Sequence, residues 1–209
     1  MRHTPLILGA SALTLAVATF GAGAWADTAG KAAKNDPSNV TQTEIDQRIA
    51  SSKASIQTLA QGLAAELEAA AEKGGPLNAL DVCNTKAAAI AQKLSAEQGM
   101  KLSRVSLKNR NVKNAAEGWT KTVLTGFETR FSAGEGIDKM EHHEVVEVDG
   151  KREFRFMKAI PIRSACLGCH GTEIKPEVQA KITELYPSDK ATGYKTGDLR
   201  GAFVVVQPF

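Results

Sequence analysis

Cysteine is scarce in this sequence, whose 209 residues include only Cys83, Cys166 and Cys169. An exported protein usually either pairs its thiols or keeps none, because its surroundings are oxidising. Three is an odd number, so at least one of these cysteines has a purpose other than an internal disulfide. The scarcity directs attention to the chemistry of each thiol.

Apolar segments long enough to cross a membrane are missing as well. The apolar stretch from Leu6 to Phe20 is shorter than the roughly 20 residues that a spanning helix needs, and no later segment approaches that length. This stretch follows Arg2 and precedes Ala24-Trp25-Ala26, an order typical of a secretory signal peptide. We therefore predict a signal peptide over residues 1–26 and a soluble, periplasmic mature protein. No cysteine lies at the cleavage junction to accept a lipid.

Blocks of like charge are a third missing feature. Lysine, arginine, aspartate and glutamate are interspersed along the whole chain. Nucleic-acid-binding proteins commonly carry a basic block or tail. The charge pattern therefore gives no reason to propose nucleic acid as a partner.

Regularly spaced apolar residues predict a long first helix. After a flexible leader over residues 27–40, Thr41-x-x-Glu44 has the form of a capping box. Apolar residues then recur every three or four positions from Ile45 to Ala70, and the pattern stops at Gly74-Gly75-Pro76. The repeat is close to 3.5 residues, which leaves two uses open: a seam for a homodimer, or packing on the chain's own domain.

A second helix is predicted from about Leu77 to Gln98, ending at Gly99. Its apolar face carries five residues spaced by threes and fours: Leu80, Cys83, Ala87, Ile90 and Leu94. Cys83 is thus expected to point inward. A free cysteine on such a face is commonly just a small buried residue, so the helix alone gives Cys83 no function.

The remaining chain predicts a small, mostly antiparallel sheet of four or five strands. Alternating residues mark one strand over Lys101–Leu107, and Asp149-Gly150 joins two more as a hairpin. Helices are expected around Trp119–Phe131 and Pro176–Leu185, before a last strand over residues 201–207. Helices first and a sheet afterwards make α+β the predicted class, with residues 41–98 and 99–209 as parts of one folding unit.

The stretch Cys166-Leu-Gly-Cys169-His170 carries the clearest chemistry. Its two thiols lie one helical turn apart and can meet two vinyl groups on one edge of a porphyrin, while the adjacent imidazole is directed at the iron. This is the attachment signature of c-type haem. We predict one covalently bound haem c, with Cys166 and Cys169 as thioethers and His170 as an iron ligand.

Zinc and disulfide redox chemistry are the alternatives for this motif. A structural zinc site needs four ligands, and no second CxxC or HxxxH cluster is present. His142 and His143 are adjacent on a predicted strand and point to opposite faces, so at most one could join. A thioredoxin-like motif would begin a long helix after a strand of a βαβ unit, and that pattern is missing.

A haem iron held by one histidine has a sixth position to fill. The candidates are Cys83, Met100, Met140, Met157, His142, His143, a lysine, water or nothing. Methionine raises the reduction potential, whereas a thiolate stabilises ferric iron and lowers it. The residues alone leave this choice open.

Several stretches, in this order, resemble a known family. They are Asp81–Lys86 (DVCNTK), Ser106–Asn111 (SLKNRN), Phe154–Pro161 (FRFMKAIP), Cys166–Gly171 (CLGCHG), Tyr186–Tyr194 (YPSDKATGY) and Gly197–Phe203 (GDLRGAF). Together they extend over about residues 40–207. The family comprises small exported single-haem proteins with a c-type haem and a PAS-like fold, proposed as haem sensors.

The resemblance implies long N-terminal helices, then a PAS-like antiparallel sheet with flanking helices. It also implies that the iron is ligated by the motif histidine and by a cysteine of the second helix, here His170 and Cys83. One departure is the segment Val112–Trp119, where a proline-rich turn is expected. Trp119 still remains available to pack on a haem edge.

Haem propionates need cationic or hydrogen-bonding partners. Residues near the matching stretches offer Lys108, Arg110, Arg163, Tyr194 and Arg200. Of these we expect Arg110 and Tyr194 to be propionate or pocket contacts. Each of these charges is equally well explained as a solvated surface group.

The predicted function is that of a redox or diatomic-gas sensor. Cys83 would leave the iron on reduction, and nitric oxide or carbon monoxide would take its place. A low-potential electron-transfer cytochrome is the alternative and would keep both ligands in both states. We do not expect an enzyme, which would need an open site with an acid/base group. The chain contains no output domain, so we expect any sensing to act through another protein or through assembly, and the sequence identifies neither a redox partner nor a receiver.

Overall fold

The longest helix, α1 (Gln42–Thr85), begins at the predicted capping residue and is kinked where the sequence predicted its end. The computed structural model describes residues 40–209, so the predicted signal peptide and all of the leader except Val40 lie outside the described residues. At the start of α1 the Thr41 hydroxyl accepts a hydrogen bond from the Glu44 amide, 3.2 Å away. This is one half of the predicted capping box.

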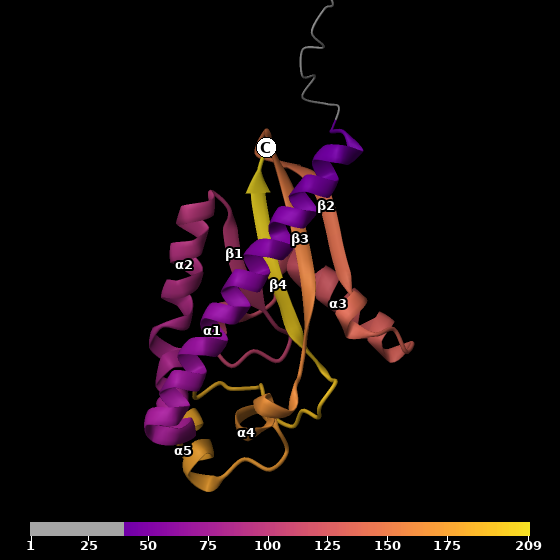
Figure 1. Cartoon of the computed structure of the whole chain (residues 1–209). Coiled ribbons are helices and arrows are strands. Elements are labelled where there is room, and N and C mark those ends of the chain that lie inside the picture. The colour runs from indigo at the N-terminus through magenta and orange to yellow at the C-terminus, as the bar shows by residue number, and fades with distance from the viewer. Residues whose placement is uncertain (1–39) are drawn as a thin grey trace, which may run out of the picture. The chain divides into compact units, whose positions relative to one another are not determined.

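The kink in α1 lies at Gly74-Gly75-Pro76 (Figure 1). Gly75 has φ 68° and ψ −163°, a conformation that is almost restricted to glycine. Pro76 has no amide hydrogen and its ring obstructs the preceding turn. The predicted break is therefore present, and it divides α1 into a long first arm and a second arm that carries Cys83.

The predicted second helix is interrupted once, at Lys86, between the end of α1 and the start of α2 (Ala87–Gln98). Helical hydrogen bonds continue on both sides of Lys86, because its amide donates to Val82 and its carbonyl accepts from Ile90. The interruption is therefore local. Gly99 then ends α2 in the left-handed conformation (φ 63°), as glycine commonly does.

The sheet has four strands in the order β1-β4-β3-β2, and every neighbouring pair is antiparallel. The strands are β1 (Lys101–Val105), β2 (Glu141–Val148), β3 (Lys151–Pro161) and β4 (Leu199–Pro208). Asp149 and Gly150 both have positive φ at the β2–β3 hairpin, as a type I′ turn requires. The predicted α+β class is confirmed: long N-terminal helices precede a four-stranded antiparallel sheet with flanking helices.

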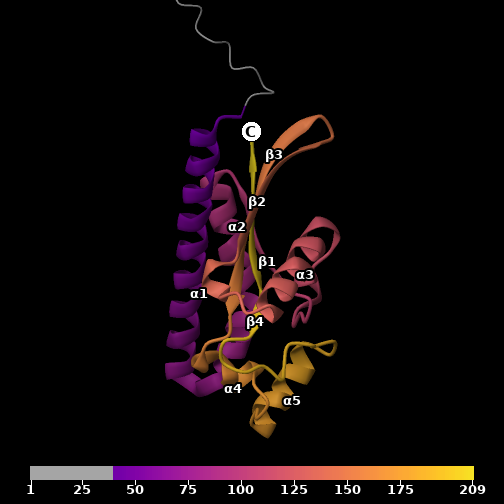
Figure 2. The same cartoon turned by 90° about the vertical axis from the view of Figure 1, so that its right-hand side faces the viewer.

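Helices cover both faces of the sheet (Figure 2). On one face, Phe154 and Phe156 pack in a cluster with residues of α1 and α2. On the other face, Met157 and Ala159 pack with α3 (Gly118–Ser132). The first arm of α1 contributes Ile56, Leu59 and Leu63 to the first cluster, so this part of its apolar stripe contacts the chain's own sheet.

Short elements gather at the end of the sheet where β3 stops (Figure 1). After β3 come η3 (Ser164–Cys166), α4 (Leu167–His170) and α5 (Pro176–Leu185); elsewhere in the chain, η1 (Val112–Asn114) precedes α3 and η2 (Ile137–Lys139) leads into β2. Val178 and Ile182 of α5 are buried against Leu80 in the second arm of α1. This contact brings the second arm to the same end of the sheet as the cysteine motif.

Residues 40–209 form one compact unit. Within this range no helix combines the length and the apolar character that crossing a membrane requires.

Candidate functional site

The two motif cysteines are free thiols in partly apolar surroundings. Cys166 ends η3 and packs against a cluster that contains Ile162 and Tyr194. Cys169 lies in α4 and packs against the cluster of Leu80 and α5. Burial raises the pKa of Cys169, with the neighbouring Arg110 cation acting in the opposite direction. Cys169 therefore stays a protonated thiol at neutral pH.

His170 is oriented by a hydrogen bond to the backbone. Its Nδ1 lies 2.6 Å from the carbonyl oxygen of Ala191. A carbonyl can only accept, so Nδ1 carries the hydrogen and Nε2 keeps the lone pair. Burial, together with the Arg200 and Arg110 cations, lowers the pKa of His170 to about 3. The imidazole is therefore neutral at physiological pH and presents one basic nitrogen, as a metal-ligating histidine must.

A buried ion pair fixes the loop that orients His170. The Arg110 guanidinium donates from Nε and Nη2 to the two carboxylate oxygens of Asp189, at 3.2 and 3.1 Å. Its Nη2 also reaches the carbonyl oxygens of Cys169 (2.6 Å) and Ala191 (3.3 Å). Both side chains are less than a tenth exposed. Arg110 thus ties the motif helix to the loop that holds Ala191.

Tyr194 lies between His170 and the Lys108 ammonium and contacts both. Its amide donates to the His170 carbonyl at 3.0 Å, and its ring meets the imidazole edge to face with centroids 6.4 Å apart. The Lys108 ammonium lies 4.3 Å from the centre of the Tyr194 ring and donates to Thr192. Tyr194 is therefore in contact with the motif, as expected of a pocket residue.

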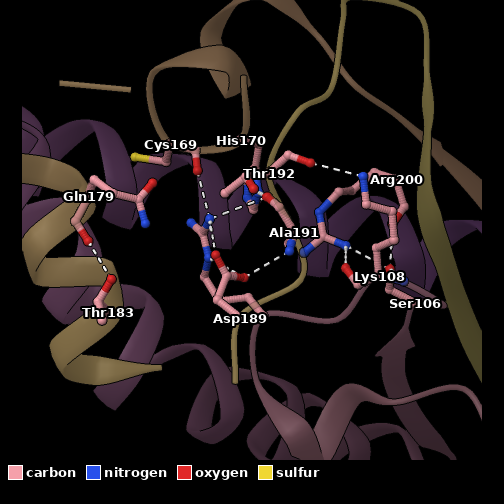
Figure 3. A network of polar contacts seen from close by, with 11 residues as sticks. Ser106, Lys108, Cys169, His170, Gln179, Thr183, Asp189, Ala191, Thr192 and Arg200 are labelled. Atoms are coloured by element: carbon pink, nitrogen blue, oxygen red, sulfur yellow. Dashed lines mark hydrogen bonds and ion pairs between the residues drawn. The ribbon is translucent and has the colours of Figure 1, made fainter. Parts of the chain in front are cut away.

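Arg200 lies beside Tyr194 and also makes hydrogen bonds. Its Nη1 donates to the Ser106 hydroxyl (2.8 Å) and to the Lys108 carbonyl (3.1 Å), as Figure 3 shows. A pocket of about 290 Å³ lies between these residues and α3. Its lining includes Lys108, Leu124, Glu128, Phe131, Tyr194 and Arg200.

Cys83 lies on the second arm of α1 and is partly buried. Leu80, one turn before it, belongs to the same apolar cluster as Cys169. Burial raises the pKa of Cys83, the Arg104 cation acts in the opposite direction, and Cys169 adds to the increase. The structure therefore brings the Cys83 thiol into the electrostatic neighbourhood of the motif.

Arg104 is a site residue that sequence reasoning missed. It lies on β1, two positions after buried Leu102 and hence on the same face of the sheet. Burial lowers the pKa of Arg104, whereas Cys83 and Tyr186 act in the opposite direction. A cation on the inward face of an alternating strand is the signal that could have identified it.

The other candidates lie in the clusters on the sheet faces. Trp119 packs with the α3 cluster under the Arg155 guanidinium, which is 4.8 Å from the ring centre. Met140 and Met157 are fully buried in that same cluster. Met100 packs on the opposite face. Neither cluster contains Cys166 or Cys169, so these four side chains pack apart from the motif.

The two strand histidines also lie in β2 rather than beside the motif. His143 stacks on Phe154 with ring centroids 6.1 Å apart, and His142 Nε2 lies 3.7 Å from a Glu144 carboxylate oxygen. They point to opposite faces, as the sequence predicted. Within residues 40–209, no three histidine, cysteine, aspartate or glutamate side chains gather closely enough to hold a metal ion between them.

A comparison with models of protein families identifies the family of this chain. A model described as Tll0287-like matches residues 30–208. The chain belongs to the Tll0287-like family. The resemblance found in the sequence motifs over residues 40–207 is thereby confirmed.

A solved structure is similar to this Tll0287-like chain. It is that of the cyanobacterial heme-protein Tll0287, with a TM-score of 0.54 and 24% sequence identity. The alignment covers 81% of this chain and 97% of that one. At this identity the similarity shows a shared fold. A comparison with curated proteins gave no match.

Proposed function

We propose that this Tll0287-like chain is an exported protein that carries one c-type haem and acts as a redox or diatomic-gas sensor. Cys166 and Cys169 would hold the haem as thioethers, and His170 and Cys83 would ligate its iron. The observation that carries the proposal is the geometry of His170, whose Nδ1–H is held by Ala191 so that Nε2 keeps its lone pair in a motif with two free cysteines. The fold is shared with a protein described as a heme-protein.

The residues at this end of the sheet fit a haem. Each thiol can add across a vinyl double bond, forming a carbon–sulfur bond while its hydrogen passes to the neighbouring vinyl carbon, so no oxidant is needed. Apolar clusters around Leu80 and Ile162 suit the porphyrin faces. Arginines outnumber carboxylates around His170, and such a surplus of positive charge suits the carboxylates of a haem.

When bound, haem supplies an iron that changes oxidation state and can take a diatomic gas as a ligand. His170 is suited to remain bound in both states, because its orientation is fixed by Ala191 and its imidazole is neutral. Cys83 is suited to dissociate from the iron. Burial raises the pKa of its thiol, so the sulfur favours the protonated form when it is not held as an anion. With the haem reduced by a redox partner, Cys83 would take up a proton and dissociate from the iron.

The kink in α1 provides a route for the signal. The first arm is anchored on the sheet through Ile56, Leu59 and Leu63. The second arm carries Cys83 and is joined to the first through Gly74-Gly75-Pro76, where Gly74 and Gly75 leave the helical backbone conformation. Release of Cys83 can therefore move the second arm without unpacking the first. The receiver is another protein.

An electron-transfer cytochrome is the second candidate, favoured by the exposure of the motif's edge. Arg163, Ser164, Ala165 and Gly168 are all exposed, and an exposed cofactor edge is what electron exchange between proteins requires. This function needs no ligand change. We do not propose catalysis, since His142 lies on β2 beside Glu144 rather than at the motif.

Optical and EPR spectra of the matured protein and of Cys83→Ala test the proposed ligation. Loss of a low-spin thiolate signal from the ferric variant is the expected result, and an unchanged spectrum would remove Cys83 from the iron. A redox titration with and without nitric oxide then separates the two functions. A sensor loses the sulfur ligand on reduction and binds nitric oxide, whereas an electron carrier keeps its ligands and its spectrum changes only in oxidation state.

A further inference from the structure

The two edges of the sheet are covered to different extents. At the β1 edge, the Leu102 amide donates to the Ser95 hydroxyl of α2 at 2.9 Å. Just beyond β1, the backbone of Ser106 forms hydrogen bonds with the segment 114–116. These contacts occupy groups that would otherwise be open to another strand. β2 forms the opposite edge, beside β3 (Figure 1).

Hydrogen bonds around β2 show which of its backbone groups face away from β3. The Met140 carbonyl, just before the strand, accepts from the Ala159 amide of β3 at 3.1 Å. In an antiparallel pair, every second residue directs both of its backbone groups at the partner strand. Even-numbered residues of β2 therefore bond to β3, and odd-numbered residues face outward. The Glu141 carbonyl agrees with this assignment, because it accepts from Arg130 Nη1 of α3, 3.4 Å away.

The other outward residues of β2 are His143, Val145 and Glu147, and within residues 40–209 no hydrogen bond reaches their backbone groups from outside the β2–β3 pair. The side chains of His143 and Glu147 are exposed, and that of Val145 is half-buried. Natural edge strands are commonly blocked by lysine, proline or a bulge. β2 contains neither residue type and pairs with β3 without a register shift. Its outer edge is therefore suited to the addition of another strand.

A second copy of this chain has the charges that match this edge. Two β2 strands can pair antiparallel about a two-fold axis at Val145. Val145 then lies opposite its own counterpart, and His143 lies opposite Glu147 of the second copy. An imidazole has an N–H to donate in either protonation state, so each pair with a carboxylate is favourable.

This register is the one that pairs all three outward residues. A shift of two residues in one direction places Glu144 opposite its own counterpart, and like charges directly opposite are unfavourable. A shift in the other direction leaves His143 opposite the hairpin turn. With the axis at Val145, the only residues of like charge directly opposite are Glu141 and Asp149. Lys53 lies 2.8 Å from the Glu141 carboxylate and offsets its charge.

We propose that two copies of this chain associate through antiparallel pairing of their β2 strands, which joins the two sheets into one. The inference does not depend on the proposed cofactor or function. It also differs from a homodimer seam on the first helix, whose residues Ile56, Leu59 and Leu63 contact the chain's own sheet. Two edge strands bury a small area, so we expect a reversible dimer with a Kd in the micromolar range or weaker.

Sedimentation velocity of the matured protein over a range of concentrations measures this equilibrium. His143→Glu places glutamate opposite Glu147 at both symmetry-related positions and should raise the Kd about tenfold or more. Ser103→Glu is the matched control. It adds a negative charge at an exposed position of β1, on the opposite edge, and should change the Kd by less than about twofold.

Exchanging the two side chains tests the register. The double variant His143→Glu/Glu147→His restores both pairs and should return the Kd to within about threefold of the wild-type value. Val145→Pro removes the outward amide at the axis and no hydrogen bond to β3, so it should abolish the dimer. If circular dichroism shows that Val145→Pro does not fold, the charge variants decide.

Two kinds of result would overturn the proposal. Sedimentation as a monomer at every concentration would leave the β2 edge to solvent or to a strand of another protein. A dimer that His143→Glu does not weaken, or that the double variant does not restore, would assign association to another surface.

Discussion

The Nδ1 atom of His170 lies 2.6 Å from the carbonyl oxygen of Ala191, a residue 21 positions later in the chain. This contact determines which ring nitrogen is available, because a carbonyl accepts and cannot donate. Ala191 is in turn held by Asp189, whose carboxylate accepts from the Ala191 amide at 2.9 Å and from Arg110. The orientation of the imidazole therefore depends on a loop and an ion pair outside the motif.

Asp189→Asn should destabilise the chain. The substitution leaves Arg110 buried without its counter-charge, which typically costs about 3–5 kcal/mol. Denaturant unfolding of the matured protein measures the effect. Glu135→Gln is the matched control, since its pair with Arg130 is more than a third exposed on both sides and solvent screening should leave it with little effect on stability. Equal losses in the two variants would contradict the buried role of the Arg110–Asp189 pair.

The free energy of unfolding should depend on pH through His170 in the haem-free chain. Burial lowers the folded-state pKa of His170 to about 3, whereas the unfolded chain takes up the proton near pH 6.5. The unfolded state therefore binds more protons between these values, and stability falls as the pH is lowered from about 6.5 toward 3.

A His170→Asn variant isolates this contribution from that of the carboxylates. The stability of the wild-type chain relative to the variant should decrease by roughly 1–3 kcal/mol between pH 6.5 and 4. Urea unfolding at a series of pH values provides the measurement. A constant difference over this range would show that His170 titrates normally in the folded chain.

Replacing both motif cysteines by serine should abolish covalent attachment. A serine hydroxyl does not replace a thiol in the addition to a vinyl group, so the Cys166→Ser/Cys169→Ser chain should carry no porphyrin after denaturation. Intact mass and haem staining on a denaturing gel report this directly. Cys83→Ser is the control and should retain the full added mass. Porphyrin that survives denaturation in the double variant would disprove the thioether assignment.

Gly75→Ala should destabilise the kink in α1. The position has φ 68° and ψ −163°, and an added Cβ would meet no atom within 4 Å, so the cost is one of backbone conformation alone. We expect a loss of about 1–3 kcal/mol. Gly126→Ala is the matched control in the middle of α3, where a Cβ also meets nothing and alanine should stabilise by about 0.5–1 kcal/mol. Thermal unfolding should shift in opposite directions for the two variants.

Local chemistry explains which parts of the fold could be predicted. Gly74-Gly75-Pro76 and Asp149-Gly150 restrict the backbone by themselves, so the kink and the hairpin are evident in the sequence. The inward position of Cys83 followed from helical spacing. The haem motif likewise depends on five consecutive residues, whose chemistry does not need the rest of the fold to be recognised.

Long-range contacts explain what was missed. Arg110 and Asp189 are 79 residues apart in the chain. The sequence around each residue contains no local pattern that predicts their pairing. Arg110 was expected near a propionate, and the structure places its Nε and Nη2 against Asp189 and two backbone carbonyls. Arg104 shared the face of Leu102 in the predicted strand, so its inward direction was available from the alternation.

The position of β4 in the sheet has a consequence for the order of events during synthesis. β4 follows the motif in the chain, yet it lies between β1 and β3 and is the strand that joins them. A chain that has emerged only as far as His170 can form the β2–β3 hairpin, but β1 still has no neighbour in the sheet. Cys166 and Cys169 therefore emerge before the sheet is complete. A modifying enzyme that needs an unfolded chain can act on them during that interval.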